Sequence, residues 1–368
     1  MKIRKFRAEG FRNIDLCEID FSDGTNLIVG GNAEGKTNVI EGIYLFSRGR
    51  SFRTADDREL IGFGHDGFRI SVEYEDEGGT STLEYALYGK ARRRMKNGYK
   101  LSSAAEMLGN FRSVLFFPDD LRLVKGNPEE RRSFLNVALS QTSPLYVSDY
   151  SRFKTALENR NAILKNAARG LYFDEGELIA WSDVMAEYSA NIYIERKKYT
   201  EELSRFAKSH LLELSGGAEE LELAYKSDIE SGTADRSEAV AEYKEVYRRS
   251  LERERAAGTS LFGPQRDDIT VLLSGREARS FASQGQQRSI VLGMKLGEGE
   301  IIHERFGEYP VFLFDDVLSE LDDERRTYLA GKTDDMQTVI TSCEGGERYL
   351  KNINVISAKG GTYVSSHR

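Results

Sequence analysis

Residues 30–37 read GGNAEGKT, which matches the phosphate-binding pattern GxxxxGK followed by Ser or Thr. A short apolar run at 26–29 precedes this stretch, and a helical pattern at 38–46 follows it. Phosphate binding requires this order, because the backbone N–H groups of the loop must converge on phosphate oxygens at the N-terminus of a helix. The alternative is a glycine-rich turn that binds no nucleotide, and the flanking strand and helix favour a P-loop.

Two side chains of this loop carry the expected chemistry. Lys36 would bridge the β- and γ-phosphates of ATP, and the hydroxyl of Thr37 would hold Mg²⁺. The expected nucleotide contacts are Gly30, Gly31, Asn32, Ala33, Glu34, Gly35, Lys36, Thr37 and Asn38. The sequence therefore predicts ATP and Mg²⁺ as cofactors.

A second nucleotide signal lies near the other end of the chain, where 311–316 reads VFLFDD. The four apolar residues predict a buried central strand, which delivers two carboxylates at its C-terminal end. We expect Asp315 to support the Mg²⁺ shell and Asp316 to orient or deprotonate the attacking water. An apolar strand that ends in Asp is common by itself, so this assignment depends on the P-loop.

Composition sets wide bounds on the function. The chain has 368 residues, of which 39% are hydrophobic and 30% charged, and this is enough for two or three domain-sized units. The formal net charge of −8 does not indicate a nucleic-acid-binding protein, so any contact with DNA must come from local basic clusters. Cys17 and Cys343 form no CxxC pair, which is typical of a reducing cytosol. No apolar stretch has the length of a membrane span, and we expect a cytoplasmic protein with no membrane contact.

The hydrophobic period changes twice along the chain. Strand patterns dominate up to about residue 89, and Asn97-Gly98 marks a hairpin turn. Helical patterns begin at Pro128 and continue to about residue 214. Short buried strands are predicted at 269–273, 311–314, 338–341 and 354–357. The predicted fold class is α/β, with a nucleotide-binding head at 1–138 and 258–368 and an inserted, mainly helical lobe at 139–257.

A third signal, SQGQQR at 283–288, stands before another helical pattern. Ser283 and Gly285 would offer a hydroxyl and free N–H groups to an anion, although an ordinary helix N-cap has the same appearance. The order of P-loop, long insertion, SxGQ and apolar strand with two Asp resembles ATP-binding-cassette (ABC) ATPases. That resemblance implies a homodimer with two ATP molecules at its interface, in which Ser283, Gly285 and Gln286 complete the site of the other copy.

Within that superfamily the chain resembles the RecF family, bacterial recombination mediators related to SMC heads. The matching blocks are 11–13, 35–53, 116–135, 158–165, 263–268, 283–288 and 314–322. The resemblance implies an SMC-like ABC-type head and an ATP-dependent clamp at junctions of single- and double-stranded DNA. It also implies that the clamp works with RecR and RecO to load RecA onto gaps, and that slow, DNA-stimulated hydrolysis releases it. The lobe is too short for the coiled-coil arms of SMC proteins.

Two positions depart from this family's pattern. Gln265 stands in the GPQRDD block where relatives usually have His, and Ser342 follows the strand at 338–341 where SMC and transporter relatives place a switch histidine. Glutamine can donate and accept hydrogen bonds but cannot titrate near neutral pH. A role that needs imidazole is therefore not expected at Gln265, and we expect phosphate sensing at Ser342 to be weaker or to be done differently.

Local basic clusters are the candidates for contact with DNA. They comprise Arg92, Arg93, Arg94, Lys96, Arg131 and Arg132, with Arg48, Arg50 and Arg53 after the P-loop helix as further candidates. No base-reading motif accompanies them, so recognition of the DNA backbone and shape is expected. Each cluster could equally be a solvated surface.

Two other classes of function stay open. One is an SMC-like structural scaffold on DNA, in which ATP only stabilises the fold or the dimer. The other is an ATPase that serves a separate nuclease or transporter. A nuclease within this chain is disfavoured, because His65, His210, His303 and His367 are scattered rather than clustered with carboxylates.

Overall fold

The computed structural model describes residues 1–343, 350 and 353–367. Contacts divide the chain into two compact units. Unit 1 is Met1–Leu121, Phe206–Glu219 and Ser283–Arg368, and unit 2 is Arg122–Arg205 and Glu220–Ala282. Unit 2 overlaps the lobe predicted at 139–257 and extends beyond it at both ends, whereas 206–219 groups with unit 1. The division into an ATPase head and a lobe at the predicted boundaries stays a prediction.

The first sheet of unit 1 is antiparallel. Its strands are β2 (Ile14–Asp20), β1 (Lys2–Phe11), β4 (Gly67–Asp76), β5 (Gly79–Tyr88), β6 (Ala91–Lys96) and β7 (Tyr99–Lys100), in that order. In β4, buried side chains alternate with more exposed ones, as expected of a sheet with one face in the core. The predicted hairpin at Asn97-Gly98 is confirmed, since both residues have positive φ, 50° and 82°.

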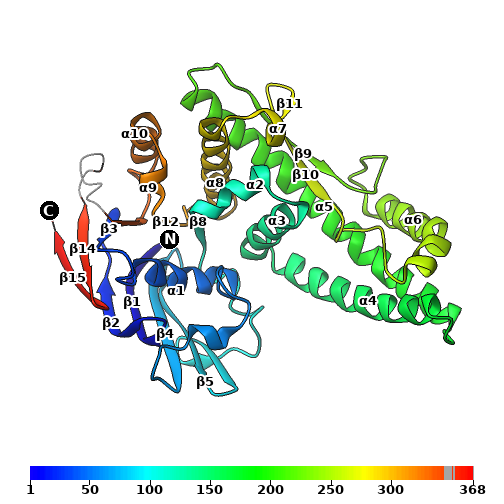
Figure 1. Cartoon of the computed structure of the whole chain (residues 1–368), viewed down its shortest axis with the longest axis horizontal. Helices are drawn as coiled ribbons and strands as arrows, with labels where there is room; N and C mark the ends of the chain where they lie inside the picture. The colour runs from blue at the N-terminus through cyan, green and yellow to red at the C-terminus, as the bar shows by residue number, and fades with distance from the viewer. Residues whose placement is uncertain (344–349, 351–352, 368) are drawn as a thin grey trace. The chain divides into compact units, whose positions relative to one another are not determined.

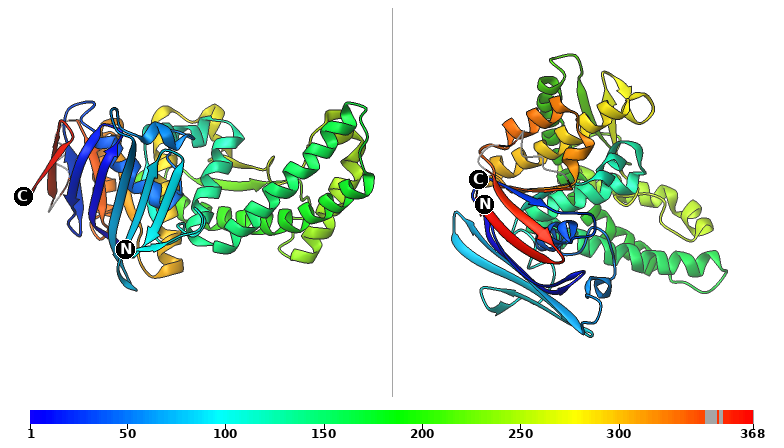
Figure 2. Two further views of the ribbon diagram at one scale, coloured as in Figure 1. Left: turned by 90° about the horizontal axis from the view of Figure 1, so that it is seen from below. Right: turned by 60° about the vertical axis from the view of Figure 1, so that its left-hand side comes forward.

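The second sheet of unit 1 carries the nucleotide motifs. Its strands are β15 (Thr362–His367), β14 (Asn354–Lys359), β3 (Thr25–Val29), β13 (Thr338–Ser342), β12 (Val311–Asp315) and β8 (Ser113–Phe116), in that order. All pairs are parallel except β14 with β15. The predicted strands β3, β12, β13 and β14 are confirmed. Figure 2 shows the late strands β14 and β15, in red, beside the early strands in blue.

Two helices cover opposite faces of this parallel sheet (Figure 1). Helix α1 (Lys36–Arg48) also packs on the antiparallel sheet, so closely that a Cβ on Gly42 would lie 2.6 Å from the Phe6 ring. Helix α8 (Gln284–Phe306) packs on β12, where a Cβ on Gly299 would lie 2.2 Å from the Phe312 ring. Since successive strand residues face opposite sides, Asp315 points away from α8 and toward α1.

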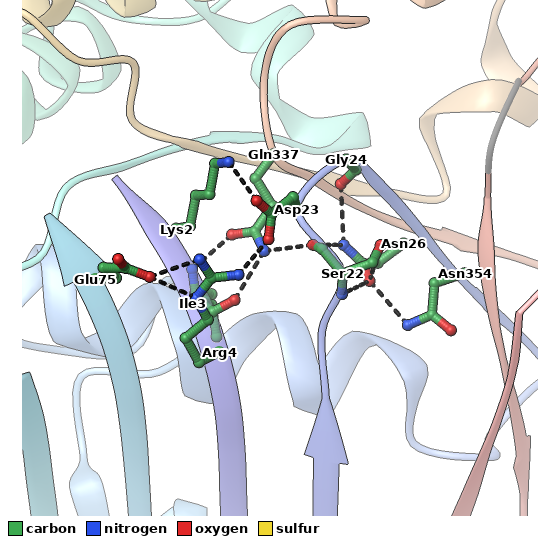
Figure 3. A network of polar contacts seen from close by, with 10 residues as sticks. All are labelled: Lys2, Ile3, Arg4, Ser22, Asp23, Gly24, Asn26, Glu75, Gln337 and Asn354. Carbon is green, nitrogen blue, oxygen red and sulfur yellow. Dashed lines mark hydrogen bonds and ion pairs between the residues drawn. The ribbon is translucent and has the colours of Figure 1, made fainter. Parts of the chain in front are cut away.

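A polar network joins the two sheets of unit 1 (Figure 3). Gln337 accepts a hydrogen bond from the N–H of Ile3 and donates to its carbonyl, at 2.6 and 2.8 Å, as a neighbouring strand would. It also donates to the carbonyl of Ser22 at 2.7 Å. The fully buried Asn26 donates to three carbonyls and accepts from Asn354 at 3.0 Å. These amides satisfy buried backbone groups where the strands of the two sheets diverge.

Shorter helices complete unit 1. They are the 3-10 helices η1 (Asp57–Leu60) and η2 (Pro118–Leu121), with α9 (Val317–Glu320) and α10 (Asp323–Lys332) after β12. The last turns of α5 (Glu175–Leu214) also belong to this unit, because a Cβ on Gly293 of α8 would lie 3.0 Å from the carbonyl of Ala207. This packing explains why 206–219 groups with unit 1.

Unit 2 is mainly helical. It contains α2 (Arg122–Lys125), α3 (Pro128–Thr142), α4 (Pro144–Ala168), most of α5, α6 (Arg236–Ala257), α7 (Ala278–Phe281) and a sheet ordered β11 (Arg276–Glu277), β10 (Asp268–Leu273), β9 (Leu221–Lys226). The predicted start of α3 at Pro128 is confirmed. An ion pair of 2.6 Å between the fully buried Arg160 and Glu254 joins α4 to α6. Among the described residues, no helix combines the length and apolar character needed to cross a bilayer.

Candidate nucleotide-binding site

The loop 30–35 connects β3 to α1, and its glycines are required by geometry. Gly35, at the N-cap of α1, has φ 91°, and a Cβ there would lie 2.6 Å from the hydroxyl of Tyr363 and 2.8 Å from Oδ1 of Asn13. A Cβ on Gly30 would lie 2.4 Å from the carbonyl of Ala358. Side chains at Gly30 and Gly35 would therefore clash with neighbouring residues. Without them the loop leaves the N-terminus of α1 open to phosphate, as the predicted P-loop requires.

Lys36 lies over this loop. Its ammonium donates to the carbonyls of Gly30 and Gly31, both at 2.7 Å, and lies 3.5 Å from the sulfur of Cys343. The side chain is nearly buried, at 7% exposure. A positive charge is thus fixed at the loop, where phosphate oxygens would meet it.

The structure brings Thr37 and Asp315 together although they are far apart in the sequence. The hydroxyl of Thr37 donates to Oδ1 of Asp315 at 2.9 Å, and the hydroxyl of Thr341 donates to the same oxygen at 2.8 Å. Thr341 also accepts the N–H of Asp316 at 2.9 Å. Burial raises the pKa of Asp315, while the two hydroxyl donors and the nearby charge of Arg53 oppose that rise.

These oxygens fit the predicted metal. A threonine hydroxyl and a carboxylate are hard donors of the kind that Mg²⁺ selects, and Mg²⁺ commonly takes only one or two protein ligands besides phosphates and waters. No group of three or more His, Cys, Asp or Glu that could hold a metal occurs in the described part of the chain. Thr37 and Asp315 are therefore the residues that could hold Mg²⁺ here.

A pocket of about 420 Å³ opens beside the loop, within the size range of small-molecule sites. It is lined by Asn13, Asn32, Ala33, Glu34, Gly35, Lys36, Thr37, Asn38, Arg53, Asp316, Thr341 and Cys343. Asn13, Thr341 and Cys343 were absent from the predicted site, and Arg53 was a candidate for DNA contact instead. Asn13 and Arg53 lie in blocks that resemble relatives, which was the one sequence signal for them.

The added residues hold the loop in place. Asn13 donates to the carbonyl of Ala33 at 2.7 Å and accepts from the amide of Asn38 at 2.6 Å. Arg53 donates to Oδ1 of Asn38 at 2.9 Å. The thiol of Cys343 donates to Oδ1 of Asn32 at 2.8 Å. Side chains from outside the P-loop thus hold its middle and the first turn of α1.

The backbone of Asp316 has an unfavourable conformation, of a kind that often occurs at functional positions. Its φ is 54°, in the left-handed region that residues other than glycine rarely occupy, and Ser319 donates to its carbonyl at 2.7 Å. Its carboxylate lines the pocket and makes no hydrogen bond or ion pair with the described residues. Strain of this kind persists where surrounding structure enforces it, often at active sites.

The predicted signature residues begin α8. Ser283 is the N-cap and forms a capping box with Gln286, whose side-chain amide also donates to Glu219 at 2.8 Å. The predicted helix start is therefore confirmed. A Cβ on Gly285 would lie 3.4 Å from the guanidinium of Arg325. Ser283, Gly285 and Gln286 are not among the residues that line the pocket of their own P-loop.

Four of the six candidate DNA residues lie on β6. Arg92 pairs with Asp57 at 2.9 Å, Arg94 stacks on the Tyr85 ring at 5.0 Å, and Lys96 donates to Asn110 at 2.7 Å. Arg93 points to the opposite face of the strand and is exposed. Half of the Arg92 side chain is also exposed, so β6 presents positive charge on the surface of unit 1.

Arg131 and Arg132 occupy a different setting, inside unit 2. The buried guanidinium of Arg131 binds both carboxylate oxygens of Asp268, at 2.6 and 2.8 Å. Arg132 donates to the carbonyl of Asp267 at 2.8 Å. The ion pair leaves little of the Arg131 charge for phosphate, so we remove Arg131 from the candidate DNA surface. Arg132 is half-buried and bonds to a neutral carbonyl, so it stays a candidate.

The structure shows the local contacts of the two residues that depart from the family pattern. Gln265 donates to the carbonyl of Phe262 at 2.6 Å and thereby closes its own turn. Ser342 accepts the N–H of Gly30 through its carbonyl at 3.4 Å, while its neighbours Thr341 and Cys343 line the pocket. Any contact with nucleotide at the end of β13 would therefore come from Thr341 or Cys343.

Comparisons with known proteins agree with this geometry. The family model described as the RecF/RecN/SMC N terminal domain matches residues 2–356. The DNA replication and repair protein RecF of Bacillus subtilis (strain 168) is 36% identical over 330 residues, which are 89% of each chain.

Solved structures also show similarity to RecF and to SMC heads. A structure of the recombination mediator protein RecF with ATP, described as part of the RecFOR pathway, matches at TM-score 0.92 and 32% identity, covering 99% of this chain and 97% of that chain. The Smc head domain of Pyrococcus furiosus matches at TM-score 0.58 and 16% identity, covering 100% of this chain and 96% of that chain, which is a likeness of fold alone. The predicted ABC-type, SMC-like α/β head is thereby confirmed.

Proposed function

This chain belongs to the RecF family of DNA replication and repair proteins, and from that premise we propose that it is an ATP-dependent DNA-binding protein of recombinational repair, located in the cytoplasm. The observation that carries the proposal is the contact of 2.9 Å between Thr37 and Asp315 beside the P-loop. In this proposal the Thr37 hydroxyl and the Asp315 carboxylate would hold Mg²⁺ beside the terminal phosphates of a nucleoside triphosphate.

Residues in and beside the pocket then have defined tasks in ATP hydrolysis. The N–H groups of residues 30–38 and the ammonium of Lys36 bind phosphate oxygens. Thr37 and Asp315 would hold Mg²⁺, which when bound neutralises developing charge on the phosphates. The carboxylate of Asp316 orients the attacking water and accepts its proton. We expect turnover to be slow and stimulated by DNA, so that the ATPase acts as a switch.

We propose further that the active site is shared between two copies of the chain. Ser283, Gly285 and Gln286 would supply the start of α8 to the nucleotide held by the other copy. Their place outside their own pocket supports this arrangement. Hydrolysis should then rise with protein concentration until the dimer saturates, because each monomer lacks part of the site.

The proposed cycle follows from these parts. ATP binding drives the heads of two copies together around DNA at single-strand to double-strand junctions of gaps, and hydrolysis releases them. The positive charge on β6, which comprises the exposed Arg92 and Arg93 and the half-buried Arg94 and Lys96, meets the phosphate backbone. The partners are single- and double-stranded DNA, a second copy of this chain, and RecR, with RecO and RecA in the pathway.

Sedimentation with a gapped duplex, with and without ATP, tests the cycle. We compare the wild type with Asp316→Asn, which should bind ATP but hydrolyse it slowly. A dimer on DNA that needs ATP and persists in Asp316→Asn supports a clamp released by hydrolysis. DNA binding by a monomer regardless of ATP would contradict it and favour the scaffold alternative.

The shared site has its own test. Lys36→Ala and Ser283→Arg chains should each be inactive alone. When they are mixed, one of the two sites in the mixed dimer loses both elements and the other keeps both. Recovery of ATPase activity supports the shared site, and a mixture as inactive as its components argues against it.

A further inference from the structure

Glu41 is a buried carboxylate next to the nucleotide pocket that none of the proposed chemistry uses. Its side chain, on α1, is fully buried. Arg12 donates to both of its oxygens, at 2.6 and 3.0 Å, Arg53 donates at 3.2 Å, and the hydroxyl of Ser51 donates as well. A buried charge is costly unless it is paired, so these donors explain how Glu41 is tolerated but not why the charge is present.

The two arginines around Glu41 are not equivalent. Arg12 is 17% exposed and makes the bidentate contact, whereas the Arg53 side chain is 44% exposed and makes the longer, single one. Two positive charges face one negative charge. Arg53 can therefore turn toward an anion while Arg12 alone continues to neutralise Glu41.

Arg53 is placed to make that turn. It lines the pocket, and its Nη1 atom is shared between Glu41 and Asn38. Its Nε and Nη2 atoms make no hydrogen bond or ion pair with the described residues. A phosphate in the pocket would thus compete with Glu41 for this guanidinium, which gives the cluster two arrangements.

Besides Glu41, Arg12 also contacts η1, the short helix that pairs with β6 through Asp57. Its N–H donates to the carbonyl of Leu60 at 2.8 Å, and its Nη1 donates to the carbonyl of Glu59 at 2.9 Å. The same short helix, η1, carries Asp57, whose Oδ2 accepts from Arg92 at 2.9 Å and from Tyr85 at 2.7 Å. Contacts therefore run without a gap from the nucleotide pocket to the basic strand.

We propose that Glu41 is a positioning residue that couples the nucleotide pocket to β6. When phosphate draws Arg53 away, Glu41 keeps Arg12 as its charged partner and Ser51 as a neutral donor, and Arg12 passes the change to η1 and to the Asp57–Arg92 pair. Because such coupling is reciprocal, DNA that engages Arg92 changes nucleotide affinity through the same contacts. This inference rests on the proposed function, since it requires that β6 meets DNA.

The test measures the affinity for a fluorescent, non-hydrolysable ATP analogue with and without saturating gapped duplex. The ratio of the two dissociation constants is the coupling factor, and we expect about tenfold for the wild type. Glu41→Gln keeps the shape of the side chain and removes its charge, and it should bring the ratio to about one. Thermal unfolding of this variant reports whether it folds.

Asp57→Asn tests the far end of the path without touching the pocket. Its nucleotide affinity without DNA should equal that of the wild type, while its coupling factor falls to about one. Asp56→Asn is the matched control, because among the described residues the side chain of the neighbouring Asp56 bonds to Arg58 and to neither Arg92 nor Tyr85, and its coupling factor should stay at the wild-type value.

The outcomes separate this inference from the proposed function. A wild-type coupling factor that survives in Asp57→Asn or in a folded Glu41→Gln overturns the role of Glu41 and leaves the proposed function standing. Equal nucleotide affinities with and without DNA in the wild type overturn both. Loss of coupling in both variants with retention in Asp56→Asn supports the path through Glu41.

Discussion

Replacing Thr341 by valine removes one oxygen from the centre of the nucleotide site and keeps the shape of the side chain. The lost hydroxyl is buried, donates to Asp315 at 2.8 Å and accepts from the N–H of Asp316 at 2.9 Å. The variant therefore leaves a carboxylate with one donor fewer and a backbone N–H without its acceptor. Both groups belong to the predicted Mg²⁺ and water sites.

The expected loss of Mg²⁺–ATP affinity follows from the hydrogen bond that Thr341 donates to the charged carboxylate of Asp315. A hydrogen bond to a charged group contributes about 1.5–3 kcal/mol, which corresponds to about ten- to a hundredfold in affinity. Burial already raises the pKa of Asp315, and loss of the Thr341 donor raises it further. Since Mg²⁺ needs the ionised carboxylate, the loss in Mg²⁺–ATP affinity should be largest at low pH and should shrink as the pH rises.

The assay measures the affinity for Mg²⁺–ATP by titration at a series of pH values from about 5.5 to 8. This range runs from just above the usual pKa of a carboxyl group to slightly alkaline pH. Thr338→Val is the matched control, because Thr338 lies on the same strand and its buried hydroxyl has no hydrogen-bond partner among the described residues. That control should bind Mg²⁺–ATP like the wild type and be at least as stable. If Thr341→Val matched the control at every pH, the reasoning from the Asp315 hydrogen bond would be refuted.

Three further predictions concern unit 1. Gly35→Ala should abolish nucleotide binding in a filter or fluorescence assay, because its Cβ would lie 2.6 Å from the hydroxyl of Tyr363 at φ 91°. Alkylation of the exposed Cys343, followed by mass spectrometry, should be slowed by ATP, while the buried Cys17 stays unmodified in either case. Burial raises the pKa of Glu298 to about 7, so the free energy of unfolding should fall as pH rises from about 4.5 to 7. Glu298→Gln should remove up to about 3 kcal/mol of that fall in the free energy of unfolding, measured by chemical denaturation.

Each of the three has a result that would contradict it. Wild-type affinity in Gly35→Ala would mean that the loop tolerates a Cβ. Equal alkylation of Cys343 with and without ATP would place the nucleotide elsewhere. Parallel pH profiles of wild type and Glu298→Gln would show that this carboxyl does not titrate in the range given.

The sequence predicted those parts of the site that are encoded locally. The P-loop, the VFLFDD strand and the Ser283 cap each lie within a few residues, and each was located correctly as an element of structure. That Thr37 and Asp315 would meet followed from the general order of such motifs in nucleotide-binding sheets.

Residues whose environment depends on distant partners could not be predicted. Arg53 looked like one more surface arginine, and its place in the pocket depends on the buried Glu41. Arg131 looked available to DNA, but its partner Asp268 is 137 positions away and its charge is buried. Strand β9 was missed because it interrupts a long helical region and its partner, β10, comes later in the chain.

The parallel sheet also constrains how the protein is made. Strand β3 lies between β13 and β14, so neither of its edges has a partner until the last part of the chain exists. Asn26 bonds to a residue 312 positions later, and at ordinary rates of translation that distance takes about 15 to 60 s to synthesise. On the ribosome the P-loop strand must therefore wait, with both edges open, while unit 2 can already fold. Conditions that slow elongation should prolong this exposure and favour aggregation of nascent chains.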